Sequence, residues 1–314
     1  MKETQTPVFM NPLTDYSFKK LFSEKELLIA FLNDVTPWET IVDIKYQPSE
    51  QLGASKEDRR AIFDLYCITG NDEYYIIEMQ VGKQMYFKDR ALFYTAFPIR
   101  KQAPRKKNWN YQLKGVYLVA VLDFILFKDE ADEDFVIEEA YLMRKRTKAR
   151  FSDKLNYLFV ELPKFNKTPA ELKTNTDRWL YCFRNMGSLN TIPEEFKDSV
   201  FEHLFDLARL EILKPTEMEA YNKSVLEYSV LQDVADCARS EGREEGEAKG
   251  REKGKAEGRV EGKIEGRVEG KVEVAKRSLL KGYSIDEIAE LTDLTPEQIK
   301  DIALTIQPTG RILN

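Results

Sequence analysis

The sequence predicts an α/β fold, a mixed sheet flanked by helices, and three features carry that prediction. Residues 63–67 and 76–80 are rich in β-branched and aromatic side chains, and the Gly-Asn-Asp turn at residues 70–72 between them favours a β-hairpin. Residues 116–122 form an unbroken apolar run, which is typical of a strand in the centre of a sheet. Before and after these strands, apolar residues recur at helical spacing.

The segments on either side of the hairpin supply the first helices and another strand. A helix opens at Asp15, and its apolar stripe continues through residues 27–32. Residues 41–47 alternate with a period of two, which suits a strand. Residues 84–102 have helical spacing, and Pro98 marks a kink or an end of that helix.

Two more strands and a helical region complete this part of the chain. Residues 135–142 and 157–162 are predicted strands, and residues 168–236 have a mainly helical pattern. A first domain is therefore predicted over residues 8–238. The core candidates of its helical region are Trp179, Phe183, Phe196 and Phe201.

The composition changes after residue 238, where glycine recurs every four residues among glutamate, lysine and arginine. Each interior glycine costs a helix about 1 kcal/mol relative to alanine, and from Glu257 onward residues four apart carry like charges, which disfavours an isolated helix. Opposite charges such as Arg243 and Glu247 favour a helix in the first half, whereas a period of two in the second half would suit a strand. We favour a helix over residues 239–274 that is fragile alone and self-associates, which predicts a homo-oligomer. The glycines are Gly242, Gly246, Gly250, Gly254, Gly258, Gly262, Gly266 and Gly270.

The last segment, residues 275–307, predicts a small helical unit. Residues 284–287 and 295–298 both have the form of a capping box, and Pro296 occupies a first helical position. With residues 275–280 they predict three short helices that resemble a helix-turn-helix. This unit is either a cap for packing or oligomerisation or a unit that reads DNA. The few basic residues on its last helix favour the cap.

Composition narrows the possible chemistry. His203 is the only histidine in 314 residues, which excludes Ser-His-Asp and Cys-His catalysis and any histidine-rich zinc or iron site. The formal net charge of −6 argues against a uniformly basic nucleic-acid binder but permits local basic patches. Cys67, Cys182 and Cys237 form no CxxC motif, and we find neither a signal-peptide-like segment nor an apolar run long enough for a bilayer. A cytoplasmic protein without a membrane partner is predicted.

Two carboxylates on the predicted hairpin are the strongest candidates for chemistry. Asp64 and Glu78 lie in neighbouring apolar runs that contain no basic residue, and Glu78 shares a strand face with Gln80. Buried carboxylates are costly unless a cation lies between them, and hard divalent cations such as Mg²⁺ take oxygen ligands. The alternative is a pair of strand acids that are neutralised by a nearby lysine or arginine.

Several motifs follow one another along nearly the whole chain. They are Asp15-x-x-Phe18-Lys19-x-Leu21-Phe22, Phe63-Asp64, Glu78-x-Gln80, Arg90 with Tyr94, Gly115-Val116-Tyr117, and the tail segment at residues 285–292. In this order they resemble the PD-(D/E)XK nuclease fold, and more closely the recombination-promoting nuclease (Rpn) family of bacteria, a PD-(D/E)XK family of transposases.

The resemblance implies metal-dependent hydrolysis of DNA phosphodiesters. It implies that Asp64 and Glu78 bind one Mg²⁺ (or Mn²⁺ or Ca²⁺), with the main-chain carbonyl of Met79 as a third ligand. A metal in this position lowers the pKa of a bound water and neutralises charge on the phosphoryl oxygens.

The sequence departs from the general fold at Gln80, where lysine is usual, although glutamine is the form that the Rpn family shows. Glutamine orients a water by hydrogen bonding but brings no positive charge. Lys19, Lys83 or Arg90 is therefore expected to supply the missing cation, and Asp15 is expected to be an additional acid at the site.

Arg90 and Tyr94 lie one helical turn apart on one face of the predicted helix. They either orient Glu78 or meet a phosphate, or they form an ordinary pair at the edge of the core. DNA binding also needs cationic surface, because phosphate contacts supply most of the non-specific affinity. The candidate residues are Arg100, Lys101, Arg105, Lys106 and Lys107 after the site helix, and Arg144, Lys145 and Arg146 after a predicted strand.

The predicted function is a DNA endonuclease with low sequence specificity, linked to recombination or mobile elements as the resemblance implies. One alternative is a non-catalytic DNA-binding or assembly protein that retains the nuclease fold. A second alternative is an RNase, because nothing in the sequence indicates how a 2′-hydroxyl would be treated.

Overall fold

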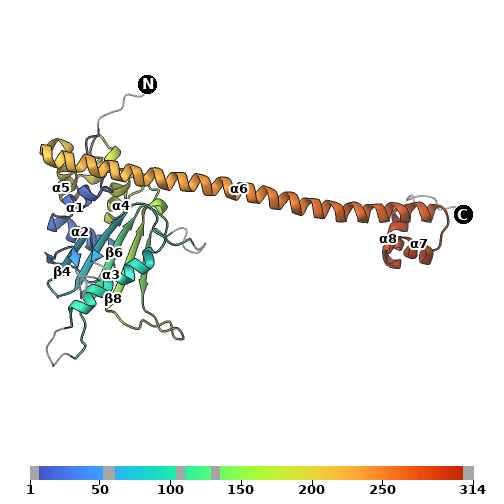
Figure 1. The fold of residues 1–314 in the computed structure, drawn as a ribbon, viewed down its shortest axis with the longest axis horizontal. Helices are drawn as coiled ribbons and strands as arrows, with labels where there is room; N and C mark the ends of the chain where they lie inside the picture. The colour runs from blue at the N-terminus through green and yellow to red at the C-terminus, as the bar shows by residue number, and fades with distance from the viewer. Residues whose placement is uncertain (1–6, 52–60, 104–109, 129–134, 307–314) are drawn as a thin grey trace, which may run out of the picture. The chain divides into compact units, whose positions relative to one another are not determined.

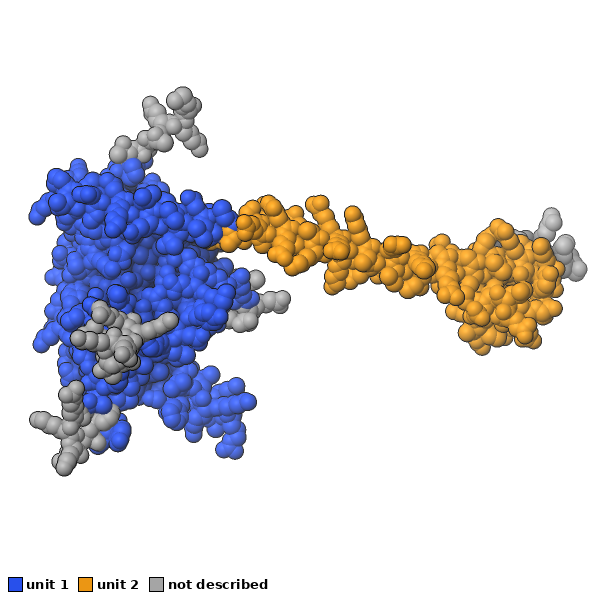
Figure 2. All heavy atoms as spheres, viewed as in Figure 1, with its two compact units in different colours: residues 1–237 blue, residues 238–314 orange. Residues whose placement is uncertain are grey.

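The structure is a computed structural model that describes residues 7–51, 61–103, 110–128 and 135–306. The chain divides into two compact units, Met1–Cys237 and Ala238–Asn314, which Figure 2 colours separately. Unit 1 holds the sheet and the helices that cover it, and unit 2 holds most of a long helix with a small helical end.

Unit 1 is built on a six-stranded mixed sheet with the strand order β1-β4-β5-β6-β8-β7. Strands β5, β6 and β8 run parallel, whereas β1, β4 and β7 pair antiparallel to their neighbours. The strands are β1 (Ile44–Tyr46), β4 (Leu65–Thr69), β5 (Tyr74–Gln80), β6 (Val116–Leu122), β7 (Ile137–Tyr141) and β8 (Leu155–Glu161). The predicted α/β class is confirmed, and every residue of β6 is buried, as its apolar run predicted.

The hairpin differs from its prediction in one detail that matters for the site. Strand β4 begins at Leu65 and pairs it with Ile77, so Asp64 lies in a bend before the strand and not within it. Short strands β2 (Glu50–Gln51) and β3 (Ala61–Ile62) form a separate ladder just upstream of this bend.

The predicted N-terminal helix is wrong as one continuous element, because the structure breaks it in two. Helix α1 (Asp15–Leu21) is capped by Thr14, whose side chain accepts the N–H of Ser17, and α2 (Lys25–Val35) follows after a short turn. Helix α3 (Phe87–Lys101) continues through Pro98, which lies close to its end. The helical region that follows contains α4 (Asn175–Asn185), α5 (Ser199–Leu207) and the 3₁₀ turns η2 (Leu162–Lys164), η3 (Pro169–Glu171), η4 (Met186–Ser188), η5 (Glu194–Phe196) and η6 (Leu210–Ile212).

The sheet separates two hydrophobic cores, and Figure 1 shows helix α3 lying across the sheet. Helices α1, α2, α4 and α5 pack on one face, where Ile77, Val119 and Leu158 point. Helix α3 covers the other face, which receives Ile76 and Leu118. Since neighbouring strand residues point to opposite faces, Glu78 points to the same face as Ile76, towards α3.

Trp179 on α4 is the centre of the larger core. Its ring lies 4.9 Å from that of Phe201 and 5.5 Å from that of Phe31, and its indole N–H donates to Asp34 at 2.9 Å. We expect Trp179→Ala to lower the free energy of unfolding by about 3–5 kcal/mol, because the substitution leaves a large cavity. Urea denaturation measures this loss. The exposed Phe151 gives the matched control, since Phe151→Ala should change stability by about 0.5 kcal/mol or less.

Helix α6 (Pro215–Leu280) is 66 residues long, begins in unit 1 and continues into unit 2. The glycine repeat is therefore helical, and the period-two strand interpretation is wrong. Its last turns form a small core with α7 (Ile285–Thr292) and α8 (Pro296–Ile306), centred on Ala275 and Ile288. The expected separate helix at residues 275–280 is instead the end of α6.

Both predicted capping boxes are present in the small helical unit. Ser284 and Glu287 exchange side-chain and backbone hydrogen bonds at the start of α7. Thr295 and Gln298 do the same at the start of α8. Within the described parts of the chain, no helix combines the length and the apolar character that crossing a bilayer requires.

Candidate functional site

Asp64 and Glu78 lie together where the bend before β4 meets β5. The backbone N–H of Asp64 donates to Glu78 Oε1 at 3.2 Å, and the backbone N–H of Met79 donates to Asp64 Oδ2 at 2.7 Å. The bend creates this arrangement, because β4 starts one residue later and the N–H of Asp64 is free to bind a side chain. Each carboxylate is thus fixed by the backbone of the segment that carries the other.

Burial makes this pair of carboxyl groups electrostatically costly. The side chain of Glu78 is 2% exposed, and its burial, together with the charge of Asp64, raises the pKa of Glu78 to about 8. Burial also raises the pKa of Asp64 above its ordinary value, against the hydrogen bond from Met79. Because the ionised forms repel one another, the site favours either a proton or a bound cation.

The raised pKa predicts how the stability of the metal-free protein depends on pH. Glu78 keeps its proton in the folded state up to about pH 8, whereas the unfolded chain releases it near the ordinary value of 4.5. Protonation of Glu78 therefore contributes fully to the free energy of unfolding below the pKa of the unfolded chain. The contribution is lost as pH rises through the pKa of the folded state. The free energy of unfolding, measured with urea and a chelator, should therefore fall from about pH 4.5 to about pH 8.

The matched variant for this measurement is Glu78→Gln, which removes the titration and should show a flatter pH profile. Glu139→Gln, at an exposed position of β7, should keep the wild-type profile. Parallel profiles for wild type and Glu78→Gln would contradict the raised pKa.

Arg90 on α3 contacts Glu78 directly. Its Nη2 donates to Glu78 Oε2 at 3.1 Å, and its Nη1 donates to the side-chain oxygens of Gln80 at 3.0 Å and Gln84 at 2.8 Å. The guanidinium carbon lies 4.8 Å from the ring centre of Tyr94, one turn further along α3. The guanidinium therefore holds three side chains near the carboxylates, and its role in function stays a prediction.

Tyr94 connects the site to the short ladder before it. Its hydroxyl donates to the carbonyl of Ile62 at 3.1 Å, and its ring packs against Phe63. Tyr94 thereby positions both Arg90 and the chain segment that leads into Asp64.

Asp15 and Lys19 on α1 act on the site through their charges. They form an ion pair with each other at 2.6 Å. The charge of Lys19 lowers the pKa of Asp64 and of Glu78, whereas the charge of Asp15 raises that of Asp64. Helix α1 therefore brings one acid and one base close enough to Asp64 to influence it.

The oxygen atoms at the site fit a divalent cation of the Mg²⁺ type. Two carboxylates that repel one another, with Glu78 buried and Asp64 partly buried, meet the charge requirement. Mg²⁺ is commonly bound through one or two carboxylates with waters completing its shell. Among the residues that the structure describes, no group of three or more His, Cys, Asp or Glu side chains gathers at metal-binding distance. The protein would thus provide two carboxylate ligands for such a cation.

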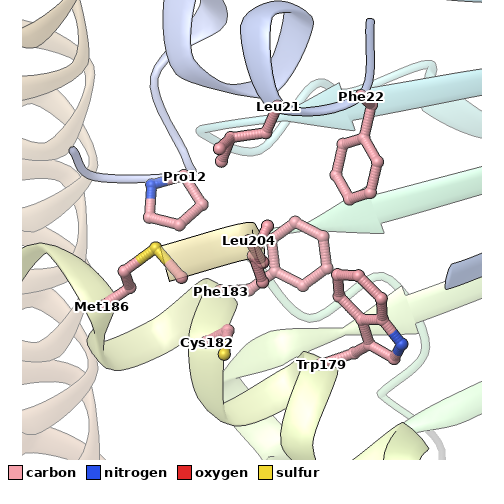
Figure 3. A pocket seen from close by; sticks show the side chains of 8 residues that line it. All are labelled: Pro12, Leu21, Phe22, Trp179, Cys182, Phe183, Met186 and Leu204. Carbon is pink, nitrogen blue, oxygen red and sulfur yellow. The ribbon is translucent and has the colours of Figure 1, made fainter. Parts of the chain in front are cut away.

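A small apolar cavity elsewhere in unit 1 does not belong to this site. It lies between the end of α1 and helices α4 and α5, and Figure 3 shows that its lining contains no charged side chain. Its lining residues are Pro12, Leu21, Phe22, Trp179, Cys182, Phe183, Met186 and Leu204.

The predicted DNA-binding residues occupy two places in unit 1. Arg100 and Lys101 end helix α3, the helix that carries Arg90, and Lys101 lies over the ring of Tyr66 at 5.5 Å. The exposed residues Arg144, Lys145 and Arg146 lie in a turn between β7 and β8. Arg105, Lys106 and Lys107 fall outside the described residues.

Sequence reasoning missed one residue of the site, Gln84. It lies in the loop between β5 and α3 and accepts a hydrogen bond from Arg90. The signal that could have found it is the chain of polar side chains that follows Glu78, namely Gln80 and Gln84, ahead of the only arginine on the first turns of the helix.

Comparison with protein families gave one match. The family described as PD-(D/E)XK nuclease family transposase matches residues 12–234, which include both carboxylates, Arg90 and the whole six-stranded sheet. Neither the comparison with curated proteins nor the comparison with solved structures gave a match.

Proposed function

The chain belongs to the PD-(D/E)XK nuclease family transposases, and on that premise we propose that it is a metal-dependent DNA endonuclease with low sequence specificity. The observation that carries the proposal is the pair of the partly buried Asp64 and the buried Glu78, held by reciprocal backbone hydrogen bonds and flanked by Arg90. Family membership links the activity to mobile elements. We propose that the enzyme acts in DNA recombination, as the resemblance to the Rpn family implies.

We propose that Asp64 and Glu78, with the carbonyl of Met79, hold Mg²⁺ or a similar ion. Bound there, the ion would supply positive charge to the phosphoryl oxygens and acidify a water. The protein's own part is to keep the ligands rigid. Met79 N–H fixes Asp64, and Asp64 N–H and Arg90 fix the two oxygens of Glu78, so no carboxylate has to reorient when the substrate binds.

Gln80 and Lys19 take the remaining roles in this proposal. The Gln80 amide donates to the carbonyl of Val81 and accepts from Arg90, which leaves one lone pair of its oxygen for the attacking water. Lys19 supplies the cation that lysine provides in the general fold, and its ion pair with Asp15 holds it near Asp64. Arg90 and Tyr94 are positioning residues.

We propose that the two basic clusters bind DNA phosphates. Arg100 and Lys101 extend from the site helix, and the turn at residues 144–146 presents three consecutive cations. Contacts of this kind carry no sequence information, which agrees with low specificity. The three residues at 105–107 extend the first cluster in sequence.

We propose three domains, residues 8–238 for the nuclease core, 239–274 for the oligomerising helix and 275–307 for the helical cap. Self-association through the helix would give a homo-oligomer. Cys67, Cys182 and Cys237 are free thiols, which supports a reducing, cytoplasmic location.

The test is cleavage of supercoiled plasmid beside an RNA of matched sequence, with Mg²⁺, Mn²⁺ or Ca²⁺ and with a chelator. The proposal predicts metal-dependent nicking or linearisation of DNA that the chelator stops. Faster cleavage of the RNA would identify an RNase instead. DNA binding without cleavage in any of the three metals would favour a non-catalytic DNA-binding protein.

A further inference from the structure

The second half of the α6 repeat differs from the first half in how its charges are spaced. In the first half, Glu245 and Lys249 form an ion pair at i,i+4, and Arg243 and Glu247 do so more loosely. Residues 258–273 instead repeat Gly-basic-apolar-Glu four times, as GRVE, GKIE, GRVE and GKVE. In that repeat, each basic residue is two positions from its nearest glutamates, so opposite charges never fall at i,i+3 or i,i+4.

This spacing leaves the helix with unbalanced columns of charge. Residues four apart are neighbours on a helix surface, so the basic residues form one column and the glutamates another. Within each column the neighbours repel one another, by a few tenths of a kcal/mol per pair. The basic column is Arg259, Lys263, Arg267 and Lys271, and the acidic column is Glu257, Glu261, Glu265, Glu269 and Glu273. Within the described part of the chain, only the ends of the columns pair elsewhere, Glu257 with Lys253, Lys271 with Asp293 and Glu273 with Arg277.

An exposed apolar stripe lies between the two columns. Val260, Ile264 and Val268 are 59%, 58% and 50% exposed, and they follow one another every four residues. A helix of this length with repeated interior glycines gains little from propensity, and most helical stability in proteins comes from packing an apolar face. A partner that covers the stripe would remove this apolar surface from water and balance both columns.

We propose that the partner is a second copy of the same helix, paired in parallel and in register through this apolar stripe. The inference deepens the self-association proposed above and does not depend on nuclease activity. Two identical parallel helices that face one another are related by a two-fold axis parallel to the helices. The column on the left of the stripe in one copy therefore meets the column on the right of the stripe in the other. Where the two stripes meet, the basic column of each copy then faces the acidic column of its partner.

An antiparallel pair has the opposite outcome. Its two-fold axis is perpendicular to the helices. The basic column of one copy therefore faces the basic column of the other on one side of the stripe, and the two acidic columns face each other on the other side. Like charges placed opposite one another at an interface are unfavourable. A parallel pair that slips by one repeat would leave an unmatched repeat at each end and would not close as a symmetric dimer.

The geometry of the pair follows from the period of the stripe. A four-residue period exceeds the 3.6 residues of a helical turn, so the stripe drifts by about 40° per repeat. Ridges of side chains four residues apart pack against one another when two helices cross at about −50°. A hydrophobic period above 3.6 residues favours a right-handed twist of the two helices around each other. Parallel pairing also joins both copies of unit 1 to the same end of the paired helices.

Disulfide cross-linking of the full-length chain tests the arrangement in a Cys237→Ser background, where the two remaining cysteines are buried. Light scattering first gives the mass of the protein, and a dimer is expected. Val260→Cys, Ile264→Cys and Val268→Cys should each cross-link to themselves on oxidation. Gly266→Cys, which lies on the opposite side of the helix from Ile264, is the matched control and should remain largely monomeric on a non-reducing gel.

Each other result overturns a defined part of the proposal. A monomer by light scattering would overturn self-association. Cross-links between Val260→Cys and Val268→Cys in a mixture, without self-links at either position, would establish the antiparallel pair. Efficient cross-linking of Gly266→Cys in place of Ile264→Cys would show that the glycine face is the contact. Nuclease activity enters none of these readouts, so its absence would count only against the proposed function.

Discussion

Replacing either Asp64 or Glu78 with alanine is expected to lower the rate of metal-dependent cleavage by about 10²–10³-fold or more. Each substitution removes one of the two carboxylates and also the acceptor of one reciprocal backbone hydrogen bond. The remaining carboxylate would have neither its partner nor its fixed orientation. The rate of plasmid nicking under single-turnover conditions measures the effect.

Glu139→Ala is the control for this pair, because it removes an exposed strand carboxylate of β7, the edge strand beyond β8. It should cleave at the wild-type rate. Thermal unfolding must show that Asp64→Ala and Glu78→Ala remain folded. Folded variants that cleave as fast as wild type would place the site elsewhere.

Replacing Arg90 with methionine should have the second largest effect, on stability as well as on activity. The variant leaves Glu78 buried without its cation and removes the donors to Gln80 and Gln84. Breaking a buried ion pair from one side costs about 3–5 kcal/mol when the other group stays charged. The cost should be smaller at pH 5, where Glu78 is protonated, and should grow as pH rises through about 8, where Glu78 ionises in the wild type.

Arg90→Lys separates charge from geometry. Lysine keeps the positive charge but cannot bridge three side chains with one planar group, so it should restore part of the stability and less of the cleavage rate. Lys45→Met, at an exposed position of β1, is the control for loss of a surface cation. A stability loss for Arg90→Met that is equal at pH 5 and pH 9 would show that Arg90 does not act through Glu78.

Much of the sheet was predictable from local pattern. The apolar run at 116–122 matches β6 residue for residue, and the hairpin follows from the turn residues and the β-branched runs on both sides. The same local logic predicted both capping boxes of the last two helices.

The errors arose where tertiary structure overrides a local pattern. An apolar stripe spanning residues 15–32 does not show that the chain turns after Phe22, since both helices pack into the same core. Asp64 looked like a strand residue because its neighbours are apolar, yet the ladder begins only at Leu65. The repeat at 258–273 fits a period of two as well as a period of four, and the continuity of α6 decides between them.

The residues of the candidate site could be predicted from the sequence, but the hydrogen bonds that connect them could not. The two carboxylates were evident from their cost in an apolar hairpin, and the family resemblance added Arg90 and Lys19. No spacing rule indicates that one guanidinium binds Glu78, Gln80 and Gln84 together, because the contacts span a loop and two elements. The influence of Lys19 on Asp64 likewise depends on how α1 packs against the rest of unit 1.

The most direct test of the central claim, that Asp64 and Glu78 hold a divalent cation, is a calorimetric Mn²⁺ titration of the metal-free protein. Wild type should bind the ion and release protons to the buffer as Glu78 ionises, and the double variant Asp64→Asn with Glu78→Gln should show neither heat nor proton release from this site. Equal Mn²⁺ binding by wild type and the double variant would contradict the account, because the ion would then lie elsewhere.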